Sequence, residues 1–509
     1  MITVYNRKAK QIVLWLFLAA LVMGAGCKKG TFDINAPNPN ALSPDVVPPK
    51  YYMPAALSAT SNIMYTGGNG FTYMGDLFNT WMGYWSASGG YTPSPIVVLY
   101  QLNSGVGNGN WDDAYFNLKN YQTMIDLSVA NPNFGNYQGI AMIMKSFGFQ
   151  RIVDLYNNAP YSEALSSDHF TPAYDNGADI YDSIVQNLDN AIAVIHTTQA
   201  NLTAEAPGKY DVMFQGNMTK WIQFANTLKL KILMNLTATS SGPAFIKSEL
   251  AKVGSEGYIT ANASVNPGYS TAANNQENPF YLDVAFTIAG SPGTNAVYWR
   301  ANSYGIGFYQ AHSDPRLGAF YQPNKAGNFQ GRKIGSVASA EGNDIISGVN
   351  GPGTAKSPAQ SSIIIGAFES YFLQAEAVQR GYITGDDAAL YKSAVEASFV
   401  TLGLTASAAD TYMAQADQTT NYVTSTNKLK TLLTQAWAAY NSFDPLASFD
   451  NWRRTGFPSD LPVSDYPGSQ AAHIPYRLPY PTSETSYNSA NVGKQGSVDY
   501  LSSKIFWQP

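Results

Sequence analysis

The fold is set by the stretch Arg151-Ile-Val-Asp-Leu-Tyr-Asn-Asn-Ala-Pro-Tyr-Ser-Glu-Ala-Leu165 of this 509-residue chain. Its first half belongs to a helix that we expect from about Tyr137 to Tyr156. Its second half ends that helix, because proline cannot continue a helix and restricts the residue before it. Arg151 and Asp154 lie three residues apart on the helix, so we expect an ion pair between them.

Apolar stripes predict further helices on both sides of this stretch. Between residues 180 and 195 the apolar side chains recur every three to four residues, which places them on one helical face. This stripe consists of Ile180, Ile184, Leu188, Ile192 and Ile195. The other expected helices are Met53–Met64, Trp111–Ser128, Met218–Leu236, Ile363–Arg380, Asp386–Leu402 and Lys428–Tyr440.

Two long segments lack helical periodicity. Residues 237–360 are broken up by Gly, Ser, Asn and Pro, with short strand-like pieces such as Tyr281–Ile288. The tail from Trp452 to Trp507 has too many prolines for regular structure and too many aromatic residues for disorder, so we expect it to wrap over the helices. The predicted fold class is mostly α, with paired helices and a large irregular loop region.

The N-terminus has the pattern of a secretory signal peptide. A basic segment around Arg7, an apolar run from Ile12 to Met23 and a small-residue stretch lead to Cys27, the only cysteine. A cysteine at this place resembles the lipobox of bacterial lipoproteins, where the thiol receives a lipid. The alternative is a transmembrane anchor with an incidental cysteine, but the run is shorter than the roughly 20 residues a spanning helix needs.

These patterns give a domain organisation. We expect a lipoprotein signal peptide at 1–26, the lipidated Cys27 with a flexible, proline-rich tether at 27–50, and one binding domain at 51–509.

The amino-acid composition restricts the kinds of molecule that the protein can bind. Charged residues make up only 13% of the chain and the net charge is −5, which argues against a nucleic-acid partner, because such partners need a basic face. Polarity comes instead from Tyr, Asn, Ser, Thr and Gly, a surface that suits neutral, hydroxyl-rich ligands.

The common catalytic and metal-binding motifs are missing from the sequence. The four histidines do not lie at ligand spacing, and no phosphate-binding loop or nucleophile elbow occurs, so we expect no metal and no cofactor. Two adjacent acid pairs, Asp112-Asp113 and Asp386-Asp387, lie near expected helix starts, where acids favour the helix dipole. The alternative for these acids is a catalytic role.

Aromatic residues give the strongest binding signal. Two clusters stand in glycine-rich or polar surroundings, and flat rings beside polar groups complement the C–H faces and hydroxyl rims of sugars. The alternative is that these rings belong to the core. The candidate ligand-binding residues are Tyr73, Trp81, Tyr84, Trp85 and Tyr91 in the first cluster, and Tyr298, Trp299, Arg300, Asn302 and Tyr304 in the second.

Several motifs together resemble the SusD/RagB family of nutrient-binding outer-membrane lipoproteins. The opening stretch Arg151–Leu165 is similar to a family motif. The others, in chain order, are Asn35–Asn40, Trp221–Lys231, Asp314–Leu317, Ser370–Gly381, Trp452–Pro458 and Ile474–Pro481. They span the chain from just after Cys27 nearly to its end.

The resemblance implies both a fold and a function. The fold would be α-helical, with tetratricopeptide-like helix pairs. The protein would bind an extracellular oligosaccharide, or a peptide, and act as a lid on a SusC-like TonB-dependent transporter. It would face the cell surface on a lipid anchor in the outer membrane and would have no catalytic activity. The alternatives are a lipid-anchored glycoside hydrolase, whose acids meet only in space, and a protein-binding helical-repeat scaffold.

Overall fold

A computed structural model of the chain describes residues 47–66, 73–273, 275–469 and 471–509. The expected signal peptide, Cys27 and the tether as far as residue 46 lie outside the described residues. Residues Pro49–Pro509 form one compact unit. It begins with a single 3-10 turn, Pro49–Tyr51, in which Pro49 is buried and Lys50 pairs with Glu205 at 3.0 Å. The ordered unit therefore starts within the segment expected to be tether.

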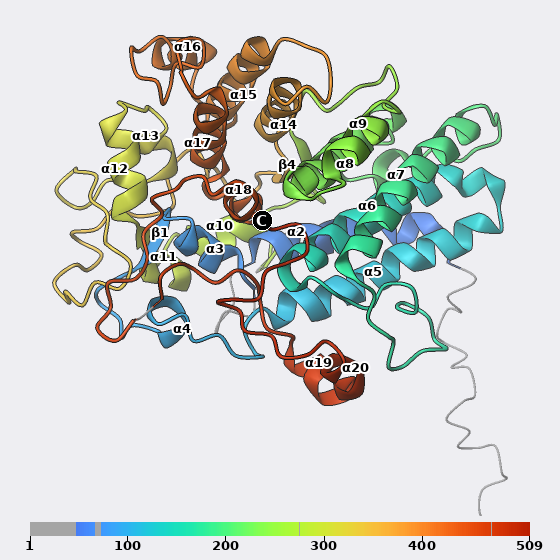
Figure 1. The fold of residues 1–509 in the computed structure, drawn as a ribbon, viewed down its shortest axis with the longest axis horizontal. Coiled ribbons are helices and arrows are strands. Elements are labelled where there is room, and N and C mark those ends of the chain that lie inside the picture. The colour runs from blue at the N-terminus through green and yellow to red at the C-terminus, as the bar shows by residue number, and fades with distance from the viewer. Residues whose placement is uncertain (1–46, 67–72, 274, 470) are drawn as a thin grey trace, which may run out of the picture. The chain divides into compact units, whose positions relative to one another are not determined.

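Helices make up most of the regular structure of this unit (Figure 1). The long ones are α2 (Met53–Tyr65), α5 (Asn108–Val129), α6 (Gly135–Tyr156), α7 (Gly177–Gln199), α8 (Met218–Asn235), α14 (Ala367–Gln379), α15 (Asp387–Thr401), α17 (Lys428–Tyr440) and α18 (Pro445–Thr455). The short ones are α3 (Gly75–Trp81), α4 (Pro95–Val98), α9 (Gly242–Leu250), α10 (Pro279–Val284), α11 (Thr294–Tyr298), α12 (Ser303–Ala311), α13 (Leu317–Phe320), α16 (Ala406–Met413), α19 (Thr482–Tyr487) and α20 (Ser489–Gly493).

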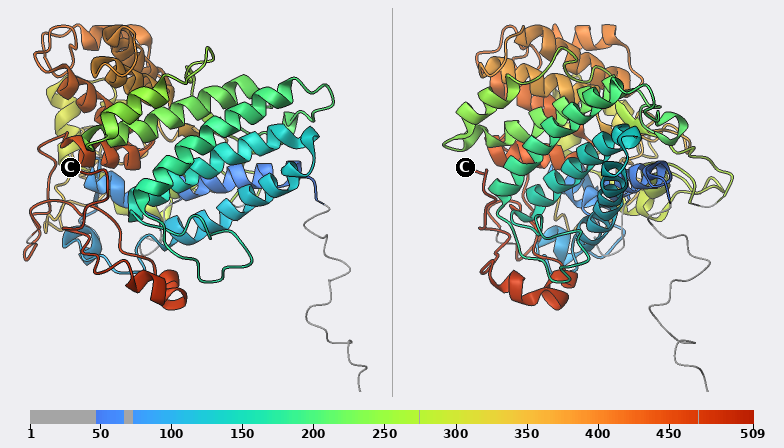
Figure 2. Two further views of the ribbon diagram at one scale, coloured as in Figure 1. Left: turned by 45° about the vertical axis from the view of Figure 1, so that its right-hand side comes forward. Right: turned by 90° about the vertical axis from the view of Figure 1, so that its right-hand side faces the viewer.

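Helices that follow one another pack as pairs. The connections between α5 and α6 and between α14 and α15 are short, which favours antiparallel neighbours. Figure 2 shows α14, α15 and α17 beside α8 and α9, and α14 also contacts α8. The stripe on α7 faces inward as expected, with Ile180, Ile184, Leu188 and Ile195 buried. This confirms the predicted mostly α fold with stacked helix pairs.

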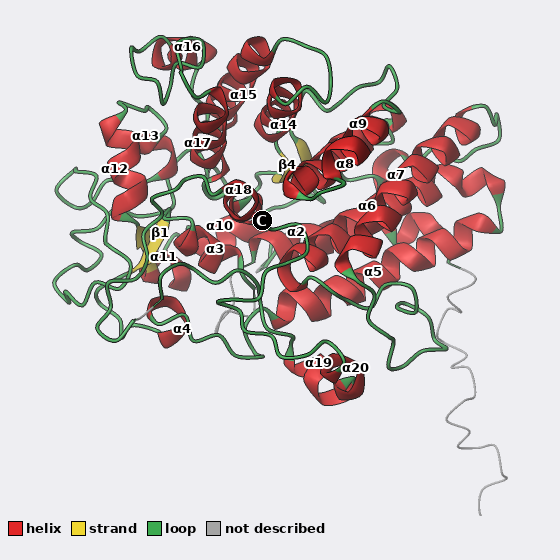
Figure 3. Cartoon of the chain, viewed as in Figure 1, coloured by secondary structure: helices red, strands yellow, loops and turns green. Residues whose placement is uncertain are grey.

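Strands are short and occur in two antiparallel pairs of the described chain. β1 (Trp85–Ala87) pairs with β3 (Trp299–Ala301), and β2 (Ala263–Val265) pairs with β4 (Ser362–Ile365). Loops dominate between α9 and α14, as expected (Figure 3). The first pair positions the candidate site described below.

Three sequence expectations were wrong in detail. Tyr281–Ile288 is not strand-like, because Pro279 starts α10 and the Asn278 side chain accepts from Tyr281 N at 3.1 Å. The helix expected from Ile363 begins only at Ala367, because the β-branched residues before it form β4. Trp452 does not start the irregular tail but lies in α18, which ends at Gly456 with φ +74°.

The expected ion pair between Arg151 and Asp154 is also wrong. Arg151 Nη1 lies 3.4 Å from a carboxylate oxygen of Asp444 on the N-cap of α18. Asp154 is buried and accepts hydrogen bonds from Gln150, Tyr181 and Trp507. Both side chains therefore join α6 to later parts of the chain and not to each other.

The tail wraps over the helices as expected. Arg453 Nη1 donates to the carbonyls of Asp154 at 2.7 Å and Tyr476 at 2.8 Å, and Leu478 N donates to Leu155 O at 2.9 Å. No helix among the described residues is long and apolar enough to span a bilayer.

Candidate functional site

A surface hollow of about 420 Å³ lies where β1 leads into the loop before α4. We call it the Tyr91 hollow. It is lined by Ser88, Gly90, Tyr91, Ala340, Gly342, Asn343, Asp344 and Ile345. Its volume falls in the range of small-molecule pockets, roughly 300–1,000 Å³.

Tyr91 forms the aromatic side of the hollow and is supported by Tyr298. Tyr91 is 42% exposed, and its ring meets the ring of Tyr298 edge-on with centroids 5.2 Å apart. Tyr298 in turn packs edge-on against Trp299, at 4.7 Å. The pairing of β1 with β3 brings these residues together, because Ser88 N donates to Tyr298 O at 2.8 Å. Tyr91 thus offers an open ring face on a rigid support.

Asn343 is the polar centre of the hollow. Its Oδ1 accepts from Ser88 Oγ at 2.9 Å and from Arg300 Nε at 2.7 Å. Within the described chain its Nδ2 has no acceptor, so that donor remains available. Arg300 is nearly buried, and burial lowers the pKa of its guanidinium while the nearby Tyr91 hydroxyl opposes this shift. Asp344 adds an exposed carboxylate, paired with Lys325 at 2.9 Å.

A buried arginine fixes the loop that carries Asn343. Arg332 Nη1 donates to Ala87 O on β1 at 2.8 Å, and its Nε donates to Glu341 Oε2 at 3.1 Å. The same Glu341 oxygen accepts from Ser336 Oγ at 2.6 Å. The loop is therefore held against the strand before any ligand arrives, which lowers the entropy lost on binding.

Of the ten residues expected to bind ligand, Tyr91 lines this hollow, while Tyr298 packs on the Tyr91 ring and Arg300 bonds to Asn343 from behind. The lining supplies the Tyr91 ring, the Asn343 amide, the Ser88 hydroxyl and the Asp344 carboxylate. Such a set can stack on the C–H face of a sugar and hydrogen-bond its hydroxyl groups.

Five of the ten are core residues. Trp81, Tyr84, Trp85, Trp299 and Asn302 are each at most 2% exposed. Trp81 packs against Phe449, with ring centroids 5.6 Å apart, and the Tyr84 hydroxyl donates to Trp437 O at 2.6 Å. Asn302 caps α12 by accepting from Tyr304 N at 2.9 Å. A ligand at the surface cannot reach these side chains. These five residues are therefore not part of the candidate binding site.

The remaining two residues lie away from the hollow. Tyr73 donates its hydroxyl hydrogen to Asp113 on α5. Tyr304 donates to Asp460 Oδ1 at 2.7 Å and packs edge-on against Trp437, at 5.4 Å. Both tyrosines are locked to a carboxylate in the described chain.

Sequence reasoning missed Ser88, Asn343 and Asp344. Ser88 lies within the first aromatic cluster, between Trp85 and Tyr91, so its position there was a usable signal. Asn343 and Asp344 lie in the irregular segment, about 40 residues after Tyr298, and no local pattern sets them apart. Only the packing of that segment against β1 brings them to the hollow.

Gly89 tests how this loop is held. A Cβ at Gly89 would lie 2.6 Å from Ala338 O and 2.8 Å from Glu341 O, both backbone atoms. Gly89→Ala is therefore expected to displace the 338–341 loop and weaken ligand binding at the hollow roughly tenfold, with little change in melting temperature. Isothermal titration calorimetry measures the loss. Gly307→Ala on α12 is the matched control, because nothing lies within 4 Å of a Cβ there and Gly307 does not line the hollow. Equal losses of binding in both variants would show that the 338–341 loop does not support the site.

A buried carboxyl group, Asp76, and the half-buried Asp283 lie behind Trp299. Asp76 on α3 is 7% exposed and accepts from Trp299 Nε1 at 2.8 Å. Burial raises the pKa of Asp76 well above its usual value, and the neighbouring carboxylate of Asp283 raises it further. Asn295 Nδ2 donates to Asp283 Oδ1 at 2.5 Å. The folded protein therefore keeps a proton on Asp76 to a higher pH than the unfolded chain does.

This proton makes stability depend on pH. A folded-state pKa above the unfolded value contributes stability that is full below the unfolded pKa, about 3.9, and is lost as pH rises through the raised pKa. The melting temperature of the wild-type protein should therefore fall as the pH rises from about 3.9 to the raised pKa of Asp76. Asp76→Asn mimics the protonated acid and should flatten the fall, measured by thermal unfolding from pH 4 to 9. Asp410→Asn, at an exposed acid, should leave the slope unchanged; an unchanged slope for Asp76→Asn would refute the raised pKa of Asp76.

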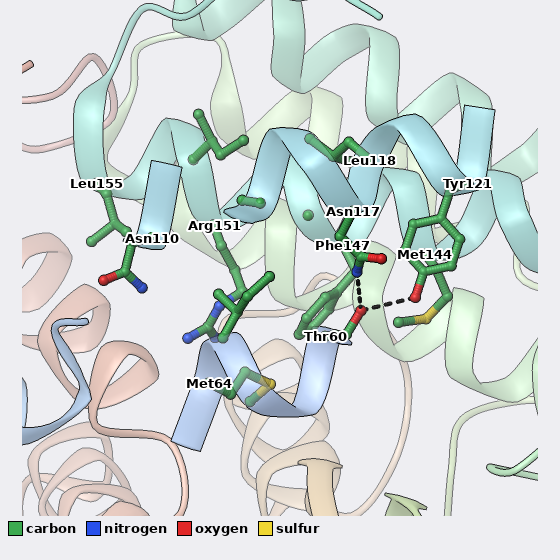
Figure 4. A pocket seen from close by; sticks show the side chains of 14 residues that line it. Thr60, Met64, Asn110, Asn117, Leu118, Tyr121, Met144, Phe147, Arg151 and Leu155 are labelled. Atoms are coloured by element: carbon green, nitrogen blue, oxygen red, sulfur yellow. Dashed lines mark hydrogen bonds between the residues drawn. The ribbon is translucent and has the colours of Figure 1, made fainter. Parts of the chain in front are cut away.

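A second, smaller cavity is part of the core. It lies between α2, α5 and α6 and has a volume of about 30 Å³, enough for one or two waters (Figure 4). Thr60 Oγ1 lies 2.8 Å from the Tyr121 hydroxyl and accepts from Asn117 Nδ2 at 3.0 Å beside it. Its polar groups satisfy one another, and it is too small for a sugar.

The family follows from comparison with known proteins. A model of the SusD-like family, described as "starch-binding associating with outer membrane", matches residues 52–481. The chain belongs to this SusD-like family. No curated protein matches it.

Solved structures share the fold. A chitin-binding protein is 23% identical with a TM-score of 0.73, covering 92% of this chain and 100% of that one. A SusD-like protein from Bacteroides thetaiotaomicron is 21% identical with a TM-score of 0.72, covering 90% and 98%. A chitin-binding SusD homolog from Flavobacterium johnsoniae is 22% identical with a TM-score of 0.73, also covering 90% and 98%.

Proposed function

We propose that this protein captures an extracellular oligosaccharide in the Tyr91 hollow and delivers it, as a lid, to a SusC-like TonB-dependent transporter in the outer membrane. Lipid on Cys27 anchors it with the binding domain facing the cell surface. The observation that carries the proposal is the exposed Tyr91 ring beside the preformed Asn343–Arg300 hydrogen bond, at 2.7 Å, in a chain of the SusD-like family.

The lining of the hollow favours a neutral glycan. The Arg300 charge is turned inward onto Asn343, and Asp344 is already paired with Lys325, so no unpaired charge dominates the described lining. What remains is one open ring face with amide and hydroxyl groups around it. Two proteins of similar structure are described as chitin-binding, and chitin is also a neutral glycan.

Binding without turnover is supported by the positions of the acids. The described lining of the Tyr91 hollow contains one carboxylate, Asp344, and that one is paired with Lys325. A glycoside hydrolase needs two acids that flank the bound sugar. The solved relatives are also described as binding proteins.

Calorimetry on the full-length protein in detergent tests the proposal. Chitohexaose and maltoheptaose should each be offered, and at least one should bind without release of new reducing ends. Tyr91→Ala should weaken binding at this hollow roughly tenfold, because each lost 1.4 kcal/mol of stacking is a factor of ten. Val337→Ala, at a 63% exposed side chain of the neighbouring loop, should bind as wild type.

Two results would contradict the proposal. New reducing ends would make the protein a hydrolase. Unchanged affinity of Tyr91→Ala at every measured site would remove the hollow from the binding function.

A further inference from the structure

A second hollow, of about 460 Å³, lies on different elements of the unit. We call it the Phe116 hollow. One side is the first half of α5, the second is the loop of residues 159–175 that joins α6 to α7, and the third is α19. None of these elements contributes to the Tyr91 hollow.

A strongly exposed ring lines this second hollow. Phe116 is 78% exposed, and Trp111 and Tyr115 on the same helix line the hollow beside it. Apolar surface that stays exposed and is rimmed by polar residues marks an interaction site.

Polar groups face the same space. Lys119 Nζ donates to Leu165 O at 2.6 Å, and an ammonium group has two further hydrogens to offer. Asp112 accepts from Ser483 Oγ at 2.5 Å, and Glu484 accepts from the Tyr174 hydroxyl at 2.8 Å. Each carboxylate keeps acceptor capacity after these bonds. The hydroxyls of Ser166 and Ser167 complete the lining.

The walls are held in place without a ligand. Ala159 and Asp175 form a backbone bridge that closes the loop. Asp175 Oδ2 accepts from the backbone N of both Tyr161 and Ser162 at 2.9 Å. Below the hollow, Trp111 stacks on Tyr174 at 6.2 Å. The hollow is preformed, so little entropy is lost when it is filled.

We propose that the Phe116 hollow is a second binding site for a neutral oligosaccharide, separate from the Tyr91 hollow. This inference rests on the proposed glycan-binding function. The Phe116 ring stacks on a sugar face, while Lys119, Asp112, Glu484 and the serines bond to hydroxyl groups. A protein partner fits less well, because a stable protein interface needs about 800 Å² on each side, and this concave site is small and polar at its walls.

Calorimetry on the full-length protein in detergent, with chitohexaose and maltoheptaose as probes, tests this site. Wild-type protein should bind the preferred probe with a stoichiometry of two. Phe116→Ala should reduce it to one or weaken the second site about tenfold. Tyr91→Ala should keep a residual site that the double variant loses. Because Phe116 is exposed, its removal leaves the fold intact, and Val129→Ala on the same helix, 66% exposed, is the matched control.

The outcomes separate the two proposals. A stoichiometry of one that depends on Tyr91 and is unaffected by Phe116→Ala overturns the second site alone. Binding that depends on Phe116 but not on Tyr91 supports the second site and removes the first. Absence of binding by either probe overturns both. Loss of transporter association in Phe116→Ala, with glycan binding unchanged, reassigns the Phe116 ring to a protein contact and overturns the inference.

Discussion

Glu376→Ala is expected to lower the free energy of unfolding by about 3–5 kcal/mol, because it leaves a buried arginine without its partner. Glu376 on α14 and Arg454 on α18 are each 1% exposed at the side chain. Their bidentate contact has Nη1–Oε1 and Nη2–Oε2 distances of 2.7 and 2.5 Å. Arg380 adds a third bond to Glu376 at 2.8 Å. This cluster fastens the start of the tail to the helix pairs.

The stabilisation by Glu376 depends on pH, because only its ionised carboxylate pairs with Arg454 and Arg380. Burial raises its pKa, but Arg454 and Arg380 outweigh burial, so the pKa lies below the usual value. A depressed folded-state pKa contributes stability that is present above the unfolded pKa and is lost as pH falls through the folded pKa. The loss caused by Glu376→Ala should therefore be largest near neutral pH and smaller in acid.

Thermal unfolding followed by circular dichroism measures these effects. Glu396→Ala, in a pair with the half-exposed Lys392, is the control and should change the melting temperature little. The double variant Glu376→Ala/Arg454→Met should be less destabilised than the sum of its single variants, because no buried charge is left from this pair. A Glu376→Ala protein as stable as wild type would refute the role of the cluster.

Arg316→Met should have a similar effect, a loss of about 3–5 kcal/mol. Arg316 and Asp314 are fully buried, and Arg316 Nη2 lies 2.6 Å from both Asp314 Oδ2 and Gln435 Oε1. The guanidinium also lies 5.1 Å from the ring centre of Phe399 on α15. One side chain thus joins the segment before α13 to α15 and α17. Methionine fills the space but leaves Asp314 buried and without its cation.

The same unfolding measurement tests this second variant. Lys333→Met removes an exposed cation, with 73% of its side chain accessible, and should unfold as wild type does. Asp314→Asn/Arg316→Met should recover part of the loss, because the buried charge is then absent. If Arg316→Met alone unfolds with the wild-type midpoint, the buried pair does not hold these helices together.

The helices could be predicted because their signals are local. Ile180 and Leu188 show the buried face of α7 by spacing alone, and Gly381 marks the end of α14 with φ +76°. Strand β4 could not be recognised, because its partner β2 lies about 100 residues earlier in the chain. For the same reason the ion pair of Arg151 was mispredicted. Arg151 pairs with Asp444, which is distant in sequence, and not with the nearby Asp154.

The candidate site could be predicted only in part. Tyr91, which is open to solvent, and Trp85, which is 1% exposed, stand in the same aromatic cluster, so the sequence does not separate a binding ring from a core ring. Asn343 reaches the hollow because Arg332 and Glu341 hold its loop on β1, and these are contacts between distant segments. Phe116 was not predicted as a binding residue, because it lies on the regular helix α5, outside the aromatic-rich loops.

A crystal of the protein soaked with whichever of chitohexaose and maltoheptaose binds would show whether the Tyr91 hollow holds the oligosaccharide. We expect a sugar ring on the face of Tyr91, with hydroxyl groups within hydrogen-bond distance of Asn343 Nδ2. A glycan bound elsewhere, with the Tyr91 hollow empty, would contradict the proposed site.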